Sequence, residues 1–421
     1  MLARCKWHTY AIMAVLALAL ILRLDYVLKF EHVPIEYDQL NYTKTAIQLL
    51  EKGVYAYLDT EPNSLVTPGF PVLLTAFYWM FGYSPLEPTL QIYRVFQCVL
   101  ALVAIWFIYK IGVRLFRPVI GVIAAMFAAV HPMFVWSTSL ILTEVPFLSV
   151  FMALIYTQVR IMQDNRLRDH IAMGVLLGIA TLIRPNVLPV AVVPYVFLWM
   201  TNRKAYIPFI AASFGAFVLV MMPWWIRNLI TFHQFIPIAK GEAGNPFLGG
   251  TDPYMRGTIE WTTIDKNDQF GEGVSRIRQG LKEEPGLWIH WFTLGKWKYF
   301  FFRHWVGPYP FHVANWYYVL LDKLHFAIIY IGWVMLPVMS LFKNRAALYL
   351  FVCLAVFYSV HALFIPEPRY IYSMLPFLML GTAQLVVGVF RTKHIANASL
   401  DKIKNIKNRN VQEGGRDSGN Q

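Results

Sequence analysis

The chain has 421 residues, of which 57% are hydrophobic and only 14% are charged. A soluble domain has about a quarter charged residues and a core too small to hide this much apolar surface, so the composition excludes an ordinary soluble protein. The net charge of +13 does not indicate a nucleic-acid partner. Many basic residues stand in short loops between apolar segments and in the last thirty residues, where membrane proteins carry their cytoplasmic charges.

The N-terminal segment is basic and then apolar up to Leu22, without a small-residue cleavage site, so we expect an uncleaved first span. Three cysteines, Cys5, Cys98 and Cys353, lie in or beside apolar stretches. None has the spacing of a metal or redox motif, and we interpret all three as packing residues.

Hydropathy predicts an all-α polytopic membrane bundle. We expect roughly 10–12 spans, some of them short for a bilayer core of about 30 Å, together with interfacial helices in the first outer loop. The ten stretches that hydropathy identifies are Trp7–Leu28, Gln91–Ile111, Pro118–Trp136, Glu144–Ile161, Ile171–Ile183, Val187–Met200, Tyr206–Ile226, Leu324–Phe342, Leu348–Ile365 and Ile371–Phe390.

The lysine and arginine distribution orients these spans. With Arg4 and Lys6 placed inside, alternation puts every short basic connection on the same side, as the positive-inside bias requires. Those connections carry Lys110, Arg114, Arg117, Arg160, Arg166, Arg168, Arg203, Lys204, Lys343, Arg345, Arg391 and Lys393. We therefore predict a multi-pass protein of the cell inner (plasma) membrane. Residues 1–390 form its transmembrane domain, and residues 391–421 form a basic cytoplasmic tail that is disordered or lies on anionic lipid.

Two large outer loops, residues 31–90 and 227–322, result from this topology. The first contains an amphipathic helix, Gln39–Lys52, with Gly53 as its C-terminal stop, and a second short helix is expected at the turn Pro68–Pro71. In the second loop the apolar, aromatic stretch Gly286–Val306 indicates an interfacial or re-entrant helix.

Three arginines, Arg184, Arg227 and Arg369, stand at predicted outer helix ends, against the positive-inside bias. The planar fork of arginine suits phosphate. Alternatively, each side chain reaches out to lipid headgroups. Three such arginines beside prolines favour a shared site.

Two carboxylates are predicted on the same side. Asp38 opens the first outer helix, and Glu144 opens a span. Both positions are also favoured for helix capping. His131 ends the preceding span, close to Glu144, where a lone histidine is more often structural than a ligand.

Carboxylates and arginines at an outer membrane face suit one type of reaction. The carboxylate accepts a proton from a hydroxyl nucleophile, and the cations stabilise a phosphate leaving group. A transporter uses similar groups to bind an anion or relay protons. It usually places them near the bilayer midplane in a repeated fold, and this sequence shows no internal repeat. A membrane scaffold without a ligand is a third alternative.

Several short motifs follow one another in a specific order. They are Asp38 with Tyr42 and Ala46, Gly53 with Tyr55, Thr67-Pro68-Gly69-Phe70-Pro71, His131-Pro132, Thr143-Glu144, Arg184-Pro185, Pro223-Trp224 to Arg227-Asn228, and Arg369-Tyr370 with Leu375-Pro376. From about Trp7 to Phe390 this order resembles the C-type membrane glycosyltransferases, in particular the bacterial relatives of protein O-mannosyltransferases and aminoarabinose transferases.

The resemblance implies an inverting hexosyl or pentosyl transfer on the extracytoplasmic face. The donor is a polyprenyl-phosphate sugar, and the acceptor is a hydroxyl of a glycan, lipid or protein. It implies Asp38 as general base and Glu144 as a support of the acceptor or the pocket. The implied substrate-binding residues are Tyr42, His131, Arg184, Arg227, Arg369 and Tyr370. The loop Lys240–Thr251, rich in glycine, matches a flexible segment that closes over the substrate.

Two positions depart from the family pattern. Many relatives carry a second acid directly after the first, where this chain has Gln39, although Glu36 stands on the other side of Asp38. Some relatives carry Lys or Glu before the proline-rich turn, where Val66 and Thr67 stand here. We therefore expect no tightly bound metal and no cofactor, since a divalent metal has no support in the sequence. Membrane lipids are the remaining expected partners, and a flippase or transporter of lipid-linked sugars is the alternative function.

Overall fold

The computed structural model describes residues 7–29, 34–200, 207–240, 244–265, 268–307 and 315–389. Within these ranges the chain forms helices and no strands, so the predicted all-α fold is confirmed. The predicted cytoplasmic tail lies outside the described residues. Five helices among the described residues are long and apolar enough to cross a membrane: α1 (Trp7–Lys29), α4 (Glu87–Leu115), α7 (Glu144–Asp164), α10 (Ile207–Phe232) and α15 (Asn315–Leu341). The protein is a polytopic membrane protein.

The other predicted spans form shorter or broken helices. The stretch predicted as one span at residues 118–136 is bent by 64° between α5 (Pro118–Val130) and the helical turns that begin at Pro132. Proline has no amide hydrogen to donate and clashes with the preceding turn, which accounts for the break. The remaining helical segments are α6 (Pro132–Trp136), η2 (Ser137–Ser139), α8 (Leu167–Ile183), η3 (Pro185–Val192), α9 (Val193–Met200), α16 (Arg345–Ala362), η6 (Pro368–Ser373) and the helix Leu375–Val389.

Small residues let neighbouring helices of the bundle approach closely at two points. Gly174 on α8 faces α10 so closely that an added Cβ would lie 2.0 Å from the Ser213 carbonyl oxygen. Gly112 on α4 faces Gly121 on α5, where an added Cβ would lie 2.5 Å from the Gly121 Cα. Such contacts let membrane helices pack through their backbones.

Basic residues meet acidic ones where the ends of α4, α7 and α8 come together. Arg114 Nη1 lies 3.2 Å from Asp164 Oδ2, and Arg160 Nη2 lies 2.5 Å from Asp169 Oδ1. These are helix ends that the charge bias places inside. The residues predicted at the outer ends gather separately, as described below, which agrees with the predicted alternation of the spans.

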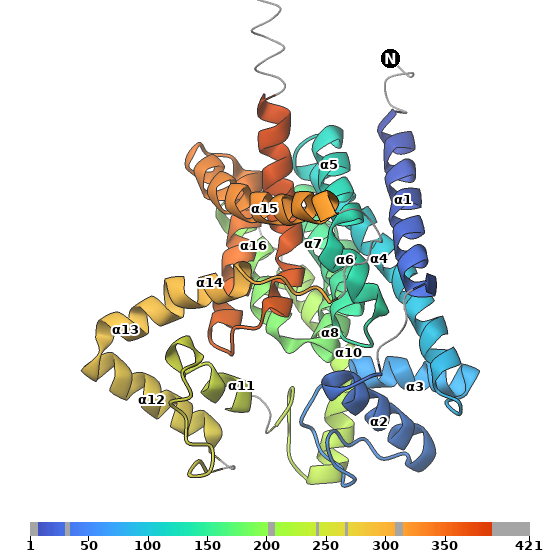
Figure 1. The fold of residues 1–421 in the computed structure, drawn as a ribbon, viewed down its shortest axis with the longest axis vertical. Coiled ribbons are helices and arrows are strands. Elements are labelled where there is room, and N and C mark those ends of the chain that lie inside the picture. The colour runs from blue at the N-terminus through green and yellow to red at the C-terminus, as the bar shows by residue number, and fades with distance from the viewer. Residues whose placement is uncertain are drawn as a thin grey trace, which may run out of the picture.

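The outer loops carry short helices at the other end of the bundle (Figure 1), away from the N-terminal end of α1 and from the C-terminal end of the helix Leu375–Val389. The first loop contains α2 (Tyr37–Lys52) and α3 (Gly69–Phe81), as predicted, and α2 ends at Gly53 with φ 66°. The second loop contains α11 (Gly244–Gly249), η4 (Pro253–Met255), α12 (Gln269–Glu283), α13 (Pro285–His290), a π-helical turn at Trp291–Gly295, and α14 (Lys296–Phe301).

Candidate active site

A cavity of about 710 Å³ opens where the first outer loop meets the ends of several bundle helices. Its lining comes from the start of α2, the loop before α3, the segment before α7, the junction of α8 and η3, the end of α16, η6, and the residues Ile238, Ala239 and Pro246. The size is typical of a small-molecule site. Apolar side chains cover much of it, and a few charged and polar groups project from its wall, including Asp38, Arg184 and Arg369.

Asp38 lies in the first turn of α2 and binds two partners at the cavity wall. Arg369 Nη1 donates to Asp38 Oδ2 over 2.7 Å, and the Tyr57 hydroxyl donates to Asp38 Oδ1 over 3.2 Å. About a third of the Asp38 side chain stays exposed (36%), so both the carboxylate and its arginine are accessible from the cavity. The N-terminal end of a helix also favours a carboxylate.

Arg369 enters the site from η6, which follows the end of α16. Burial acts to lower the pKa of Arg369, but the nearby charges of Glu144 and Asp38 outweigh this effect and raise the pKa overall. Arg369 therefore remains a cation. Its guanidinium lies 5.6 Å from the ring centroid of Tyr370, which also lines the cavity.

A second charged pair lies beside the first. Arg184 Nη2 donates to Glu144 Oε1, and Arg184 Nε donates to Thr143 Oγ1 over 2.7 Å. Glu144 is buried (1% exposed), whereas Arg184 lines the cavity. Glu144 thus binds Arg184 on its buried side and orients its guanidinium at the cavity wall.

Tyr42 stands one turn after Asp38 and lines the same cavity. Its ring lies 5.4 Å from that of Tyr57 and 4.9 Å from that of Phe70. Burial, with a smaller effect of Asp38, raises the pKa of Tyr42. Its phenol therefore remains protonated and is a hydrogen-bond donor at the wall.

Arg227 and His131 do not reach the cavity. Arg227 donates to the backbone carbonyls of Asn63 (2.9 Å) and Tyr55 (2.8 Å), which ties α10 to the first outer loop. His131 is buried, and its Nε2 lies 3.0 Å from His325 Nδ1. The structure therefore separates these two predicted substrate-binding residues from the other six candidates.

The sequence analysis assigned no role to four polar residues of the site. Tyr57 binds Asp38, Thr143 binds Arg184, and Asn186 Nδ2 lies 2.6 Å from His361 Nε2 at the cavity wall. Thr143 belongs to the Thr143-Glu144 motif, and Asn186 directly follows Arg184-Pro185. His361 is a histidine inside the apolar stretch 348–365, which by itself indicates a candidate site residue. Tyr57 has no such signal, because only the folded loop brings it to Asp38.

The residues of the site do not resemble a metal centre. In the part of the chain that the structure describes, no group of three or more His, Cys, Asp or Glu side chains is arranged to hold a metal ion. Gln39, which follows the candidate base, accepts a hydrogen bond from Ile141 N over 2.9 Å. An amide at this position connects α2 to the segment before α7 and adds no charge. The absence of a metal cofactor stays a prediction.

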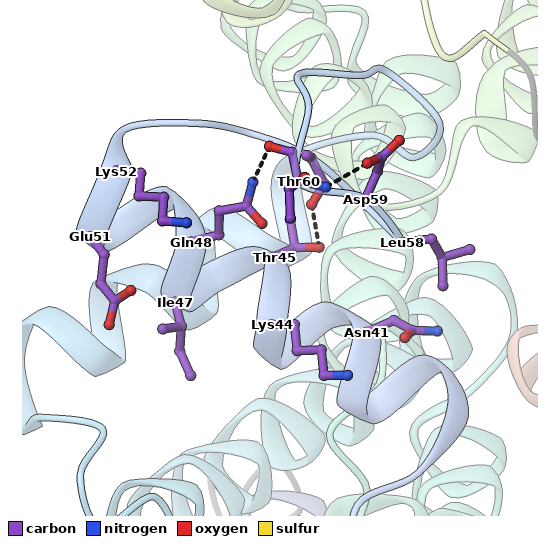
Figure 2. A pocket seen from close by; sticks show the side chains of 11 residues that line it. Asn41, Lys44, Thr45, Ile47, Gln48, Glu51, Lys52, Leu58, Asp59 and Thr60 are labelled. Atoms are coloured by element: carbon purple, nitrogen blue, oxygen red, sulfur yellow. Dashed lines mark hydrogen bonds between the residues drawn. The ribbon is translucent and has the colours of Figure 1, made fainter.

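Figure 2 shows a second cavity, of about 630 Å³, on another face of α2. Thr45 Oγ1 and Gln48 Nε2 there donate to the carbonyls of Ala56 (2.9 Å) and Thr60 (2.8 Å), and Asp59 stands in the same loop. None of the eight predicted site residues lines it. We assign no role to this cavity.

Residues 66–226, less than half of the chain, match the family model described as dolichyl-phosphate-mannose-protein mannosyltransferase. No curated protein sequence matches the chain. The matched region carries the proline-rich turn, Glu144 and Arg184.

The fold is similar to those of two solved membrane proteins. ArnT from Cupriavidus metallidurans, bound to undecaprenyl phosphate, shares 13% identity at a TM-score of 0.54, over 90% of this chain and 59% of its own. The archaeal oligosaccharyltransferase AglB from Archaeoglobus fulgidus, in complex with an inhibitory peptide and a dolichol-phosphate, shares 14% identity at a TM-score of 0.57, over 94% of this chain and 52% of its own. This chain thus spans between half and three fifths of their lengths. The predicted resemblance to C-type membrane glycosyltransferases is confirmed.

Proposed function

We propose that the protein is an inverting glycosyltransferase that moves a sugar from a polyprenyl-phosphate donor to a hydroxyl acceptor. The observation that carries this proposal is the pairing of Asp38 with Arg369 at the wall of the 710 Å³ cavity. It combines a carboxylate that can accept a proton with a cation that can bind a phosphate. The solved structures of ArnT and AglB contain bound undecaprenyl phosphate and dolichol-phosphate, which are lipid phosphates of this chemical type.

In the proposed reaction Asp38 removes the proton of the acceptor hydroxyl. The acceptor oxygen forms a bond to the anomeric carbon, while the bond from that carbon to the phosphate oxygen breaks on the opposite face. One displacement of this kind inverts the configuration of the sugar. The acceptor is a glycan, lipid or protein.

Arg369 and Arg184 stabilise the departing polyprenyl phosphate. Both guanidinium groups line the cavity and keep donors beyond those used for Asp38 and Glu144. A fixed cation in a site shielded from water stabilises developing negative charge without reorganisation. We place the site on the extracytoplasmic face of the cell inner membrane, because it lies away from the basic helix ends that the charge bias puts inside.

Replacing Arg369 with alanine is expected to weaken the binding of polyprenyl phosphate about 10- to 100-fold, since charge-assisted hydrogen bonds contribute about 1.5–3 kcal/mol. Neutral polyprenol should bind equally to both proteins. The matched control is Arg227→Met, which removes an arginine that binds only backbone and neighbouring side chains outside the cavity. It should lower the thermal stability and leave phosphate affinity unchanged. Equal affinity of wild type and Arg369→Ala would remove Arg369 from the phosphate site.

Treatment with a strong chelator is expected to leave transfer within about twofold of the untreated rate, because arginines supply the positive charge at the leaving group. The assay compares initial rates of the untreated protein, of the treated protein, and of the treated protein after Mg²⁺ or Mn²⁺ is restored. A loss that either cation reverses would contradict the metal-independent reaction.

A further inference from the structure

Lys296 is a buried basic residue outside the cavity wall. It is the first residue of α14, and its side chain is 0% exposed. Its ammonium group donates to the carbonyl oxygens of Ala362 (2.7 Å) and Phe364 (3.0 Å). In the described part of the chain Lys296 forms no ion pair with a carboxylate.

The surroundings of Lys296 suit a cation that binds carbonyls. Its Nζ lies 4.2 Å from the ring centroid of Phe292 and 5.5 Å from that of Trp291, within the range of cation–π attraction. Burial lowers the pKa of Lys296 to about 7. The C-terminal carbonyls of α16 act against this lowering of the pKa, because the helix dipole favours positive charge there. Burial of an ammonium group costs free energy unless hydrogen bonds compensate, and the carbonyls of Ala362 and Phe364 supply such bonds.

The two carbonyls that Lys296 binds stand at the start of the segment leading to Arg369. Ala362 is the last residue of α16, and Phe364 stands five residues before Arg369. Because the start of this segment is fixed, the Arg369 guanidinium can reach only a limited set of positions. It has to reach Asp38 at the wall of the cavity.

The second outer loop holds the same segment from another direction. Ile365 N donates to the carbonyl of Pro246 on α11 over 3.0 Å. Gly250 packs against the backbone of Phe364, where an added Cβ would lie 2.6 Å from the Phe364 carbonyl carbon. The Trp291 indole in turn donates to the Gly250 carbonyl over 2.9 Å. Lys296 and α11 thus hold residues 362–365 between them.

We propose that Lys296 is a positioning residue, which holds the segment 362–370 so that Arg369 meets Asp38 and the donor phosphate. The proposal rests on the proposed function for the role of Arg369. It also assigns a task to Lys296 and α11 of the second outer loop, which hold the segment that carries a substrate-binding residue.

The first arm of the experiment measures coupling between Lys296 and Arg369. Lys296→Met should lower kcat/KM for the donor about 10- to 100-fold, as expected for a displaced binding group. Lys296→Arg, which keeps a cation with several donors, should recover most of this loss. The double variant Lys296→Met/Arg369→Ala should be no worse than Arg369→Ala alone. Additive losses would overturn the positioning role.

The second arm needs no substrate. Hydrogen–deuterium exchange at the backbone amides of residues 363–370 should be at least tenfold faster in Lys296→Met than in wild type, because the segment loses its anchor. Arg160→Met, which removes the partner of Asp169 at the other end of the bundle, is the control. It should lower thermal stability without changing exchange in residues 363–370.

The outcomes separate the two proposals. Unchanged exchange of residues 363–370 in Lys296→Met overturns the role of Lys296, whether or not transfer is observed. Absence of transfer by the wild-type protein, with fast exchange in Lys296→Met, contradicts the proposed function and leaves the anchoring of the segment supported.

Discussion

Replacing Asp38 with asparagine is expected to lower the rate of sugar transfer about 10²- to 10⁴-fold, the usual contribution of a general base. The amide has nearly the same shape: its oxygen can still accept from Arg369, which lies 2.7 Å from Oδ2, and its NH2 group can donate to the Tyr57 hydroxyl, which lies 3.2 Å from Oδ1 and can act as acceptor. It no longer accepts the acceptor's proton. The measurement is kcat with saturating polyprenyl-phosphate sugar, so that a change in donor affinity does not contribute.

Asp59→Asn is the matched control for this variant. Asp59 is an exposed acid of the same outer loop that caps the backbone amides of Thr60 and Glu61 and does not line the active-site cavity. Its replacement should change kcat by less than about twofold, since surface substitutions have small effects. Full activity of correctly folded Asp38→Asn would rule out Asp38 as the base.

Replacing Arg184 with methionine is expected to lower the free energy of unfolding by about 3–5 kcal/mol, because it leaves the buried Glu144 carboxylate without its charged partner. Glu144 is 1% exposed, and its second oxygen, Oε2, has no hydrogen-bond partner among the described residues. The measurement is the unfolding midpoint in detergent micelles, compared with the wild-type protein.

The double variant Arg184→Met/Glu144→Leu separates stability from catalysis. Two apolar side chains replace the whole pair, so most of the lost stability should return. Transfer should stay impaired, because the cavity has lost one of its two phosphate-binding cations. A stable and fully active double variant would show that this pair serves the fold alone.

Most of the fold can be predicted from sequence, since the bilayer imposes strict physical requirements. Each of the ten predicted stretches contains a helix, and the helix predicted at Gln39–Lys52 forms at Tyr37–Lys52 with Gly53 as its stop. The break at His131–Pro132 is one difference in the fold, and the 3₁₀ helix Pro185–Val192 in place of the start of a predicted span is another. Hydropathy averages over a window and does not sense that one proline bends an apolar stretch.

The candidate site can be predicted only in part. Asp38, Glu144, Arg184 and Arg369 do gather at one end of the bundle, as expected from topology. Their pairing could not be predicted, because 331 residues separate Asp38 from Arg369. The two arginines at the cavity differ from Arg227 in the hydrogen-bond partners that the folded loops place beside each guanidinium. Carbonyls of Tyr55 and Asn63 occupy Arg227, and a positional bias in the sequence does not reveal such partners.

The most direct test of the proposed function follows the labelled sugar of a polyprenyl-phosphate donor. Purified protein in lipid nanodiscs, supplied with a cell-envelope fraction as the source of acceptor, should form a labelled product of inverted anomeric configuration. It should release polyprenyl phosphate in an amount equal to the product. In Asp38→Asn, both product formation and phosphate release should be much slower than in the wild-type protein. The proposed function would be contradicted if the wild-type protein left the donor intact in nanodiscs while moving it across the bilayer of sealed vesicles, as a flippase does.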